Sequence, residues 1–451
     1  MTEYAVLSWL LLYVFCWVLP LTIRKPNRRR MLVWAFPIAG FALLAVQRDM
    51  APCWRLICAS LFLLYAFKGS ILTTQSRDVV RKLGPWALGV YMTVWPGMDI
   101  GGFNVRELPS RNTGVRFTRG LLFVYLGLAI SFSVAVLAQR LSDQVVGWVG
   151  ICALLLTVHF GISDVLSSLA TLFGRRVGPL FDQPLKSSTL SEFWTQRWNR
   201  PFVEMDRQLM IRPLSRVVGL RWAVFGVFLI SGLLHELALS YPSGSGYGGP
   251  LLYFAIQGAA VLAEKRIKVR SRIITWAVIL LPIPLLFHLG FRNKFIVPLF
   301  HWLNTFLTDH SPVWFVDRGL WVLGAMQLLV LMASFQVPAR LRWKEELPRL
   351  SPLNRKLMWT NGSFIVLTIV AFGTLTLALH RSFINREPAA IGIASFAFTF
   401  WILRILVDCF YYKQSDWPEG EQFVIGHALL NSLFAFLALG YGSYVVWAVW
   451  G

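Results

Sequence analysis

The chain of 451 residues is 56% hydrophobic and 14% charged, and its mean hydropathy is +0.58. Soluble domains carry about 25% charged residues, so this composition excludes an ordinary soluble protein. Long apolar stretches recur from end to end, whereas the short alternating strands of a membrane barrel are absent. The sequence therefore predicts an all-α polytopic membrane protein with about 12 transmembrane helices and one or two re-entrant or interfacial segments.

The formal net charge of +21 is compatible with a nucleic-acid partner or with a membrane surface. The positions of the basic residues favour the membrane. Of the 43 Lys and Arg residues, 33 fall in six segments between apolar stretches, namely 24–30, 68–82, 106–119, 161–221, 264–272 and 338–358. This asymmetry is typical of cytoplasmic loops and places the N-terminus outside. We therefore expect contacts with anionic lipid head groups and no nucleic-acid partner.

Hydropathy predicts twelve spans along the chain, at 4–23, 31–46, 53–67, 120–138, 145–161, 222–241, 250–264, 273–291, 319–337, 361–380, 389–411 and 426–449. Two further apolar stretches, 83–103 and 294–307, contain Gly, Pro or polar residues that favour re-entrant or interfacial segments. A polar, basic run at 338–360 marks a change in composition. We take it as dividing a core at 1–318 from a C-terminal helical transmembrane extension at 319–451.

The longest break between clear spans is the basic segment 161–221, which contains the run EFWTQRWN at residues 192–199. Ser188 or Thr189 could cap a helix that begins near Leu190, with Glu192 in its first turn. Pro201 is expected to kink or end this helix. Tryptophans and arginines of this kind gather at membrane interfaces, so we expect the segment to lie against the cytoplasmic face or to dip into it, without crossing.

His235 is the most informative single residue, because it lies 13 residues after Trp222 in an apolar helix, or ~20 Å along its axis. Ionisable residues inside a membrane are costly and are functional candidates by default. The imidazole could be a general base, although a histidine that only packs between helices is the alternative. Asn199, 36 residues earlier, could donate to a developing oxyanion or orient a substrate, or it could be a surface residue.

These two motifs together resemble the membrane-bound O-acyltransferase superfamily, and most closely its wax synthase branch with the related diacylglycerol acyltransferases. The family pattern is an FW-x-x-RWN-like run followed, some tens of residues on, by a His in an apolar helix, here GLLHEL. The matching residues are Phe193, Trp194, Arg197, Trp198, Asn199, His235 and Glu236. The resemblance covers about 160–300. Thr195 replaces the glycine that usually follows the first Trp, a mild departure from the family pattern.

The resemblance implies an integral-membrane enzyme that forms an ester from acyl-CoA, which enters from the cytoplasm, and a lipophilic alcohol, which enters from the membrane. His235 is then the catalytic base and Asn199 the second essential polar residue. Substrate contacts are expected from Trp194 and Trp198 as walls of the acyl channel, from Arg197, which would hold the loop or the CoA phosphates, and from Phe193 and Glu236. Acyl-CoA is a co-substrate, and neither a bound cofactor nor a metal is expected. Leu239 takes the place of the second His of an HExxH zinc motif.

Several alternatives stay open at the level of sequence. Arg404 and Asp408, four residues apart in a predicted span, are compatible with a transporter or flippase of a lipid-like substrate. The last four spans could instead be a docking or oligomerisation module. The remaining open positions lie near the cytoplasmic side: His159 and Asp164 could line an acyl-CoA entrance or end a helix, and Arg175, Arg176 and Lys186 could bind CoA phosphates or anchor the chain. Short loops favour a bacterial plasma membrane, with the endoplasmic reticulum as the alternative.

Overall fold

The computed structural model describes residues 3–22, 26–46, 50–75, 77–105, 111–267, 270–412, 417–418 and 420–450. Parts of the predicted basic segments, at 24–25, 76, 106–110 and 268–269, lie outside the described residues, as does residue 23 of the first predicted span. The chain forms two compact units. The first comprises Met1–Pro109 and Arg119–Asn304, and the second Ser110–Thr118 and Thr305–Gly451. The predicted boundary at 318/319 between a core and an extension stays a prediction about function.

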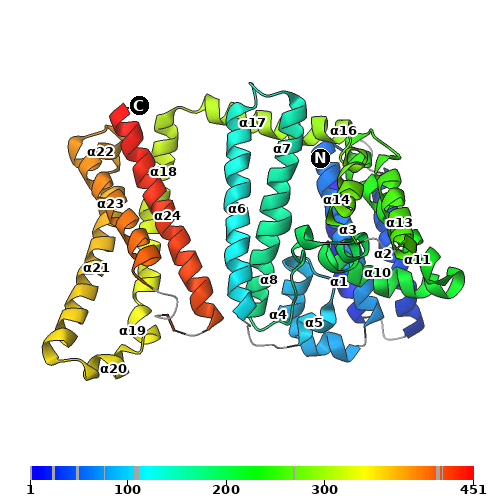
Figure 1. The fold of residues 1–451 in the computed structure, drawn as a ribbon, viewed down its shortest axis with the longest axis horizontal. Helices are drawn as coiled ribbons and strands as arrows, with labels where there is room; N and C mark the ends of the chain where they lie inside the picture. Colours follow the sequence, from blue (N-terminus) through cyan, green and yellow to red (C-terminus); the bar gives the residue numbers. More distant parts are fainter. Residues whose placement is uncertain are drawn as a thin grey trace. The chain divides into compact units, whose positions relative to one another are not determined.

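The helices up to α17 build the first unit, except that the start of α6 as far as Thr118 and the end of α17 from Thr305 belong to the second unit (Figure 1). They are α1 (Glu3–Thr22), α2 (Pro26–Val46), α3 (Pro52–Thr74), α4 (Arg77–Thr93), α5 (Ile100–Asn104), α6 (Arg111–Leu137), α7 (Asp143–Leu154), α8 (Ser163–Leu172), α9 (Leu190–Glu192), α10 (Arg200–Asp206), α11 (Arg212–His235), α12 (Tyr241–Ser243), α13 (Gly249–Ile267), α14 (Arg272–Leu280), α15 (Ile283–Leu286), α16 (Leu289–Phe291) and α17 (Val297–Asp309). Wider π-helical turns lie at Leu155–Ile162, Phe193–Arg197, Arg207–Ile211, Glu236–Ser240 and Arg292–Ile296, and a short 3₁₀ turn at Pro184–Lys186.

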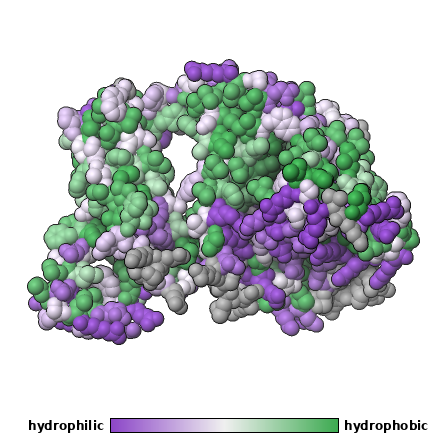
Figure 2. All heavy atoms as spheres, viewed as in Figure 1, coloured by the Kyte–Doolittle hydropathy of each residue, from purple (hydrophilic) through white to green (hydrophobic). Residues whose placement is uncertain are grey.

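The second unit contains α18 (Pro312–Ser334), α19 (Val337–Arg340), α20 (Trp343–Glu346), a 3₁₀ turn (Leu347–Arg349), α21 (Pro352–Ala378), α22 (His380–Ile384), α23 (Pro388–Phe410) and α24 (Glu421–Trp450). Interhelical hydrogen bonds join its long helices, from Trp401 Nε1 to Gln327 Oε1 (2.9 Å) and between the Thr376 and Tyr441 hydroxyls (2.8 Å). In Figure 2 apolar residues cover much of the length of these helices, and hydrophilic residues gather at the end that carries α20.

Eight helical segments of the described residues are long and apolar enough to cross a membrane, or nine if the bent pair Arg272–Leu286 and Leu289–Asp309 forms one span. The all-α, multi-pass prediction is therefore confirmed, whereas the count of twelve is not. Three predicted spans, 4–23, 31–46 and 250–264, correspond to helices α1, α2 and α13, which are not among the eight. The predicted interfacial stretch 294–307 lies in the second half of the bent pair, which turns by 61°.

Two glycines break helices that would otherwise run straight. Gly84 in α4 has φ 75° and ψ 161°, and Gly219 in α11 has φ 79° and ψ 159°. This conformation is accessible essentially to glycine alone. The break at Gly84 agrees with the prediction that 83–103 is not a straight span. The break at Gly219 separates a leading segment from the helix that carries His235.

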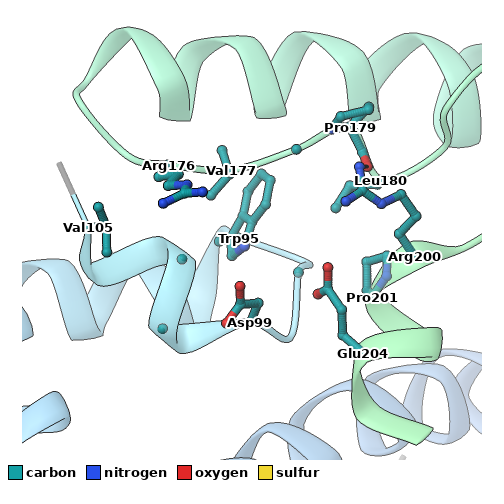
Figure 3. A pocket seen from close by; sticks show the side chains of 14 residues that line it. Trp95, Asp99, Val105, Arg176, Val177, Pro179, Leu180, Arg200, Pro201 and Glu204 are labelled. Atoms are coloured by element: carbon teal, nitrogen blue, oxygen red, sulfur yellow. Dashed lines mark hydrogen bonds between the residues drawn. The ribbon is translucent and has the colours of Figure 1, made fainter. Parts of the chain in front are cut away.

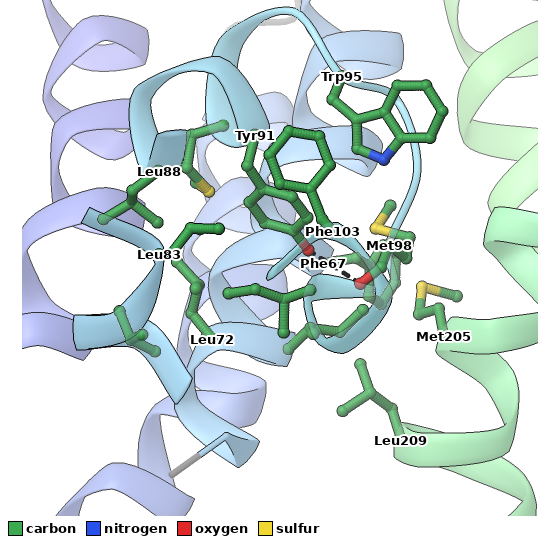
Figure 4. Packing of buried hydrophobic residues seen from close by; sticks show 14 of the residues in the cluster. Phe67, Leu72, Leu83, Leu88, Tyr91, Trp95, Met98, Phe103, Met205 and Leu209 are labelled. Atoms are coloured by element: carbon green, nitrogen blue, oxygen red, sulfur yellow. Dashed lines mark hydrogen bonds between the residues drawn. The ribbon is translucent and has the colours of Figure 1, made fainter. Parts of the chain in front are cut away.

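The core of the first unit lies where α3, α4 and α5 meet α10 (Figure 4). Phe67 and Tyr91 of α3 and α4, Phe103 of α5 and Met205 of α10 are all buried there. This cluster fixes α10 against the N-terminal helices, and α10 begins directly after Asn199.

Candidate active site

The helix that carries the aromatic motif is held at its start by two side chains. The Thr189 hydroxyl accepts a hydrogen bond from the Glu192 backbone N–H (3.0 Å), so the predicted cap is confirmed as Thr189. The Glu264 carboxylate on α13 accepts from the N–H groups of Leu190 and Ser191, at 2.7 and 2.9 Å. Both contacts satisfy N–H groups that have no partner inside the helix.

Arg197 is used to hold the neighbouring loop. Its Nε donates to Glu192 Oε1 (2.7 Å), and its Nη1 donates to the Asp182 carbonyl (3.1 Å). The backbone N–H of Asp182 donates in return to the Arg197 carbonyl (2.8 Å). The backbone N–H of Ser188 is the main cause that lowers the pKa of Glu192 below its ordinary value, and Arg197 adds to the effect. Of the two roles considered for Arg197, these contacts support the holding of the loop.

The aromatic residues of the motif pack against one another. Phe193 is buried and stacks on Trp198, with ring centroids 5.2 Å apart and planes inclined by 18°. Trp198 meets Phe181 edge to face at 5.1 Å. Ring contacts of this geometry stabilise the fold by more than the burial of apolar surface alone. Phe193 and Trp198 therefore pack on the inner side of the segment that leads to Asn199.

Asn199 stands at the turn between the motif and α10. Its φ is 42°, a left-handed conformation that asparagine adopts more readily than most residues. Its carbonyl accepts from the N–H groups of Phe202 and Val203, and Pro201 lies in the first turn of α10. The expectation that Pro201 kinks or ends the motif helix is wrong, because that helix already ends at Arg197 and Pro201 starts the next one, a position where proline is tolerated. Within the described residues the Asn199 amide makes no hydrogen bond, so it can bind another group.

The His235 ring has a defined orientation. Its Nδ1 lies 2.7 Å from the Ser231 carbonyl oxygen. Because a carbonyl can only accept, Nδ1 carries the proton, and in the neutral ring Nε2 keeps its lone pair. The ring centroid lies 4.5 Å from that of Phe254 on α13. A π-helical turn, Glu236–Ser240, follows directly, as is frequent at functional sites.

Helix α13 links the motif to His235. The Trp194 ring also packs on Phe254, with centroids 5.6 Å apart, and its Nε1 donates to Gln257 Oε1 (3.2 Å). Gln257 Nε2 donates in turn to the Val278 carbonyl (2.7 Å). Trp194 of the motif and His235 thus both contact Phe254 of α13.

Sequence reasoning missed the contribution of α13. Phe254, Gln257 and Glu264 lie three and seven residues apart, so they share one face of the helix. The sequence feature that indicates this face is the pair Gln257 and Glu264, two polar residues at helical spacing in an otherwise apolar segment.

Glu236 anchors the start of α13. Its Oε1 accepts from the N–H groups of Gly248 (2.9 Å) and Leu251 (3.1 Å). Such a carboxylate at a helix N-terminus is favourable in charge and in hydrogen bonding. Its contact with a substrate stays a prediction.

A Ser–His side-chain pair lies beyond the end of α11, where Ser240 Oγ is 3.4 Å from His288 Nε2. The backbone N–H of Phe291 donates to His288 Nδ1 (3.1 Å), so Nδ1 is the acceptor. In the neutral ring Nε2 then carries the proton and cannot take one from Ser240. This pair is not an activated nucleophile.

A polar cavity of about 430 Å³ opens beside the start of α10 (Figure 3). Its charged lining consists of two carboxylates, Asp99 and Glu204, and two guanidinium groups, Arg176 and Arg200. Figure 3 shows both carboxylates directed into the same space. Arg200 directly follows Asn199, so the cavity borders the motif.

The other predicted residues have partners of their own. Asp164 is paired with Arg119 (2.7 Å), and Arg175 donates to the Phe103 carbonyl (3.3 Å). In the second unit, Asp408 lies 3.6 Å from Arg404 and accepts from His427 Nε2 (2.6 Å). The predicted Arg404–Asp408 pair is therefore present. Among the described residues no group of three or more His, Cys, Asp or Glu side chains could hold a metal ion.

Residues 177–256, which contain both Asn199 and His235, match the sequence model of the membrane bound O-acyl transferase family. The resemblance to this superfamily is therefore confirmed, and it is carried by the segment that builds the site.

Individual relatives refine the comparison. The chain is 30% identical over 137 residues to a long-chain-alcohol O-fatty-acyltransferase of Simmondsia chinensis, covering 26% of this chain and 38% of that protein. It is 34% identical over 84 residues to the probable long-chain-alcohol O-fatty-acyltransferase 2 of Arabidopsis thaliana (16% and 24%). It is 27% identical over 123 residues to the acyl-CoA–sterol O-acyltransferase 1 of the same plant (25% and 36%). The chain spans about a third of the length of these relatives, and the wax synthase-like resemblance is confirmed over that stretch.

Proposed function

We propose that the chain is an integral-membrane O-acyltransferase that transfers an acyl group from acyl-CoA to the hydroxyl of a lipophilic alcohol. The observation that carries this proposal is the His235 ring, whose Nδ1–H is committed to the Ser231 carbonyl and whose Nε2 is left as a base. The family match over 177–256 supports it, as do the three relatives named above, all described as O-acyltransferases. None of these comparisons favours a transporter.

In the proposed reaction, His235 Nε2 takes the proton of the alcohol as its oxygen attacks the thioester carbonyl. The tetrahedral intermediate collapses, the C–S bond breaks, and the imidazolium returns the proton to the departing thiolate. The products are an ester and free CoA. The Asn199 amide donates to the oxyanion or orients the reacting groups. Because the thioester is already activated, acyl-CoA serves as co-substrate and no bound cofactor takes part.

The polar cavity beside α10 is the proposed position of the nucleotide end of acyl-CoA. Guanidinium groups such as Arg176 and Arg200 suit phosphates. Carboxylates such as Asp99 and Glu204 accept from hydroxyl and amino groups, which ribose and adenine carry. Trp194 and Trp198 then wall the path of the acyl chain, as the resemblance implies.

Ester formation from labelled acyl-CoA and a panel of lipophilic alcohols tests the proposal in membranes with matched expression levels. His235→Ala and His235→Gln should reduce kcat by roughly 10²–10⁴-fold, because the base is lost. Asn199→Ala should reduce it by about 10²-fold or more.

His310→Ala is the matched control, since His310 Nδ1 bonds the Phe306 carbonyl (2.9 Å) in the same local geometry but in the second unit. It should leave activity unchanged. Wild-type activity that survives both His235 substitutions contradicts the mechanism, and wild-type membranes inactive with every pair contradict the function.

We further propose that the basic segments face the cytoplasm and that the N-terminus lies outside, as their charge asymmetry indicates. Labelling by an impermeant thiol reagent of a cysteine introduced near residue 344 in a cysteine-free chain checks this, since labelling should require opened membranes. The relatives named here are plant proteins, so a bacterial plasma membrane and the alternative of the endoplasmic reticulum both stay predictions. So does an oligomeric state.

A further inference from the structure

Lys68 is a lysine buried completely in the middle of an apolar helix. Its exposed fraction is 0%, and it lies in α3 between Phe67 and Ile71, which belong to the core of the first unit. The sequence places it at the start of a basic cytoplasmic segment, 68–82. That assignment is wrong for this residue, because α3 continues to Thr74 and encloses it. A buried charge is costly unless other groups compensate it.

Backbone carbonyl groups provide the compensation. Lys68 Nζ donates to the carbonyl oxygens of Tyr91 and Trp95, and it lies 4.3 Å from the centroid of the Tyr91 ring. Within the described residues no acidic side chain pairs with it. The ammonium is therefore held by a helix end and an aromatic face.

The location of these carbonyls explains why a cation is needed. Helix α4 ends at Thr93, and the carbonyls of its last turn have no donors inside the helix. A positive charge at a helix C-terminus is also favourable for the helix dipole. Lys68 thus caps α4 from a neighbouring helix at a point where water is excluded.

The capped segment continues as one wall of the polar cavity. Residues 95–99 have no regular structure and lead to α5. The Tyr91 hydroxyl donates to the Met98 carbonyl (2.9 Å), so the segment is tied at two places, by Lys68 at Trp95 and by Tyr91 at Met98. Trp95, Gly97 and Asp99 all line the cavity (Figure 3).

The wall has little freedom to shift without changing the cavity. A Cβ on Gly97 would lie 2.3 Å from Trp95 Nε1, and a Cβ on Gly102 would lie 2.6 Å from Asp99 Oδ2 and 2.9 Å from the Arg176 carbonyl. Backbone and side chains are therefore packed closely around Asp99. A displacement of Trp95 would be transmitted to Asp99, which faces the cavity.

We propose that Lys68 is a positioning residue, whose ammonium fixes the 95–99 wall so that Asp99 and Trp95 can receive the nucleotide end of acyl-CoA. This inference rests on the proposed function, since it takes that cavity as the acyl-CoA site. Lys68 itself does not contact the substrate. Its loss should weaken binding of the CoA end while leaving the His235 chemistry in place.

The test uses the full chain in membranes and, for binding, the purified full chain in detergent. Lys68→Met keeps the length of the side chain and removes the ammonium. It should raise the KM for acyl-CoA by about tenfold or more, while kcat and the KM for the alcohol change less. Coenzyme A alone should raise the thermal midpoint of the wild type and lose this effect in Lys68→Met. Lys68→Arg, which keeps the charge, should retain part of the protection by coenzyme A.

Two further variants keep the test decisive. Lys265→Met removes an exposed lysine at the end of α13 and should leave every value unchanged. If Lys68→Met does not fold, Lys68→Gln decides, because it keeps a polar side chain but withdraws the donor from the Trp95 carbonyl; an unchanged KM for acyl-CoA then overturns the proposal. A folded Lys68→Met protein with the wild-type KM for acyl-CoA and wild-type protection by coenzyme A overturns the role of Lys68 and leaves the proposed function standing. A wild type that forms no ester and is not protected overturns the proposed function as well.

Discussion

Ionisable side chains around the candidate site bind backbone groups more often than they bind one another. Lys68 donates to two carbonyls at the end of α4, and the carboxylates of Glu236 and Glu264 accept from N–H groups at helix starts. Helix ends leave such groups without partners, and leaving them unpaired is costly where water is excluded. Each charge therefore determines where a helix begins or ends. Substituting one of these residues changes local backbone geometry as well as charge.

Glu192 gives a pH-dependent prediction at the same scale. Its carboxylate accepts from the Ser188 N–H and pairs with Arg197, and its pKa is lowered, chiefly by the Ser188 bond. A lowered pKa in the folded state stabilises the protein at pH values above the ordinary pKa of the group, and the contribution is lost as the pH falls through the lowered value. Glu192→Gln should therefore reduce stability by about 1 kcal/mol at pH 7.

Thermal midpoints of the purified protein, measured from pH 7 down to pH 3, check this expectation. The loss at pH 7 should shrink as the wild-type carboxyl becomes protonated. Glu346→Gln removes an exposed ion pair with Arg349 and should have little effect at any pH. A Glu192→Gln deficit that stays constant down to pH 3 would contradict the assignment to this ionised carboxylate.

At the scale of elements, the break at Gly219 sets the direction of the helix that carries His235. A Cβ at this position would meet nothing within 4 Å, so the obstacle to substitution is the backbone conformation alone, φ 79° and ψ 159°. Gly219→Ala should reduce stability by about 1–3 kcal/mol, or straighten the helix and reduce ester formation.

Gly226→Ala in the same helix provides the comparison, because Gly226 has no left-handed φ and its Cβ would make only an ordinary contact at 3.9 Å. It should be neutral or slightly stabilising. Thermal midpoints and ester formation of the two variants separate the effect of the backbone conformation at Gly219 from that of adding a methyl group to the helix. Equal behaviour would show that the break does not depend on glycine.

The sequence was informative about local structure and silent about which elements meet. The Thr189 cap and the helical setting of His235 follow from rules that act within a few residues. The contact of Trp194 and His235 with one residue, Phe254, depends on how α13 packs, and no local rule supplies that. Lys68 was misassigned for the same reason, because its partners lie 23 and 27 residues away along the chain.

At the scale of the whole molecule, the second unit includes a short segment from the first third of the chain. The Gly114 N–H donates to Glu421 Oε2 (2.5 Å), and a Cβ on Gly114 would lie 2.5 Å from Val424 Cγ1. Gly114, near the start of α6, thus packs closely against the start of α24. The predicted extension 319–451 is therefore not a simple appendage.

A chain that ends at residue 318 should consequently accumulate in membranes at a lower level than the full chain, because Gly114 loses these partners. Supplying 319–451 as a separate polypeptide should restore part of the loss. Immunoblots of membranes and ester formation per amount of protein provide the measurements. A truncated chain that accumulates and reacts like the full one would show that the first unit is sufficient by itself.

Helix α13 has one consequence for how the substrate range of such a protein can change. A single face of this helix carries Phe254, Gln257 and Glu264, which contact His235, Trp194 and the start of the motif helix. One exchange on this face would therefore adjust the proposed base and the proposed aromatic wall together, without altering either motif. Directed evolution toward a bulkier alcohol should accumulate its substitutions on α13, so two proteins with identical motifs can differ in the alcohols they accept.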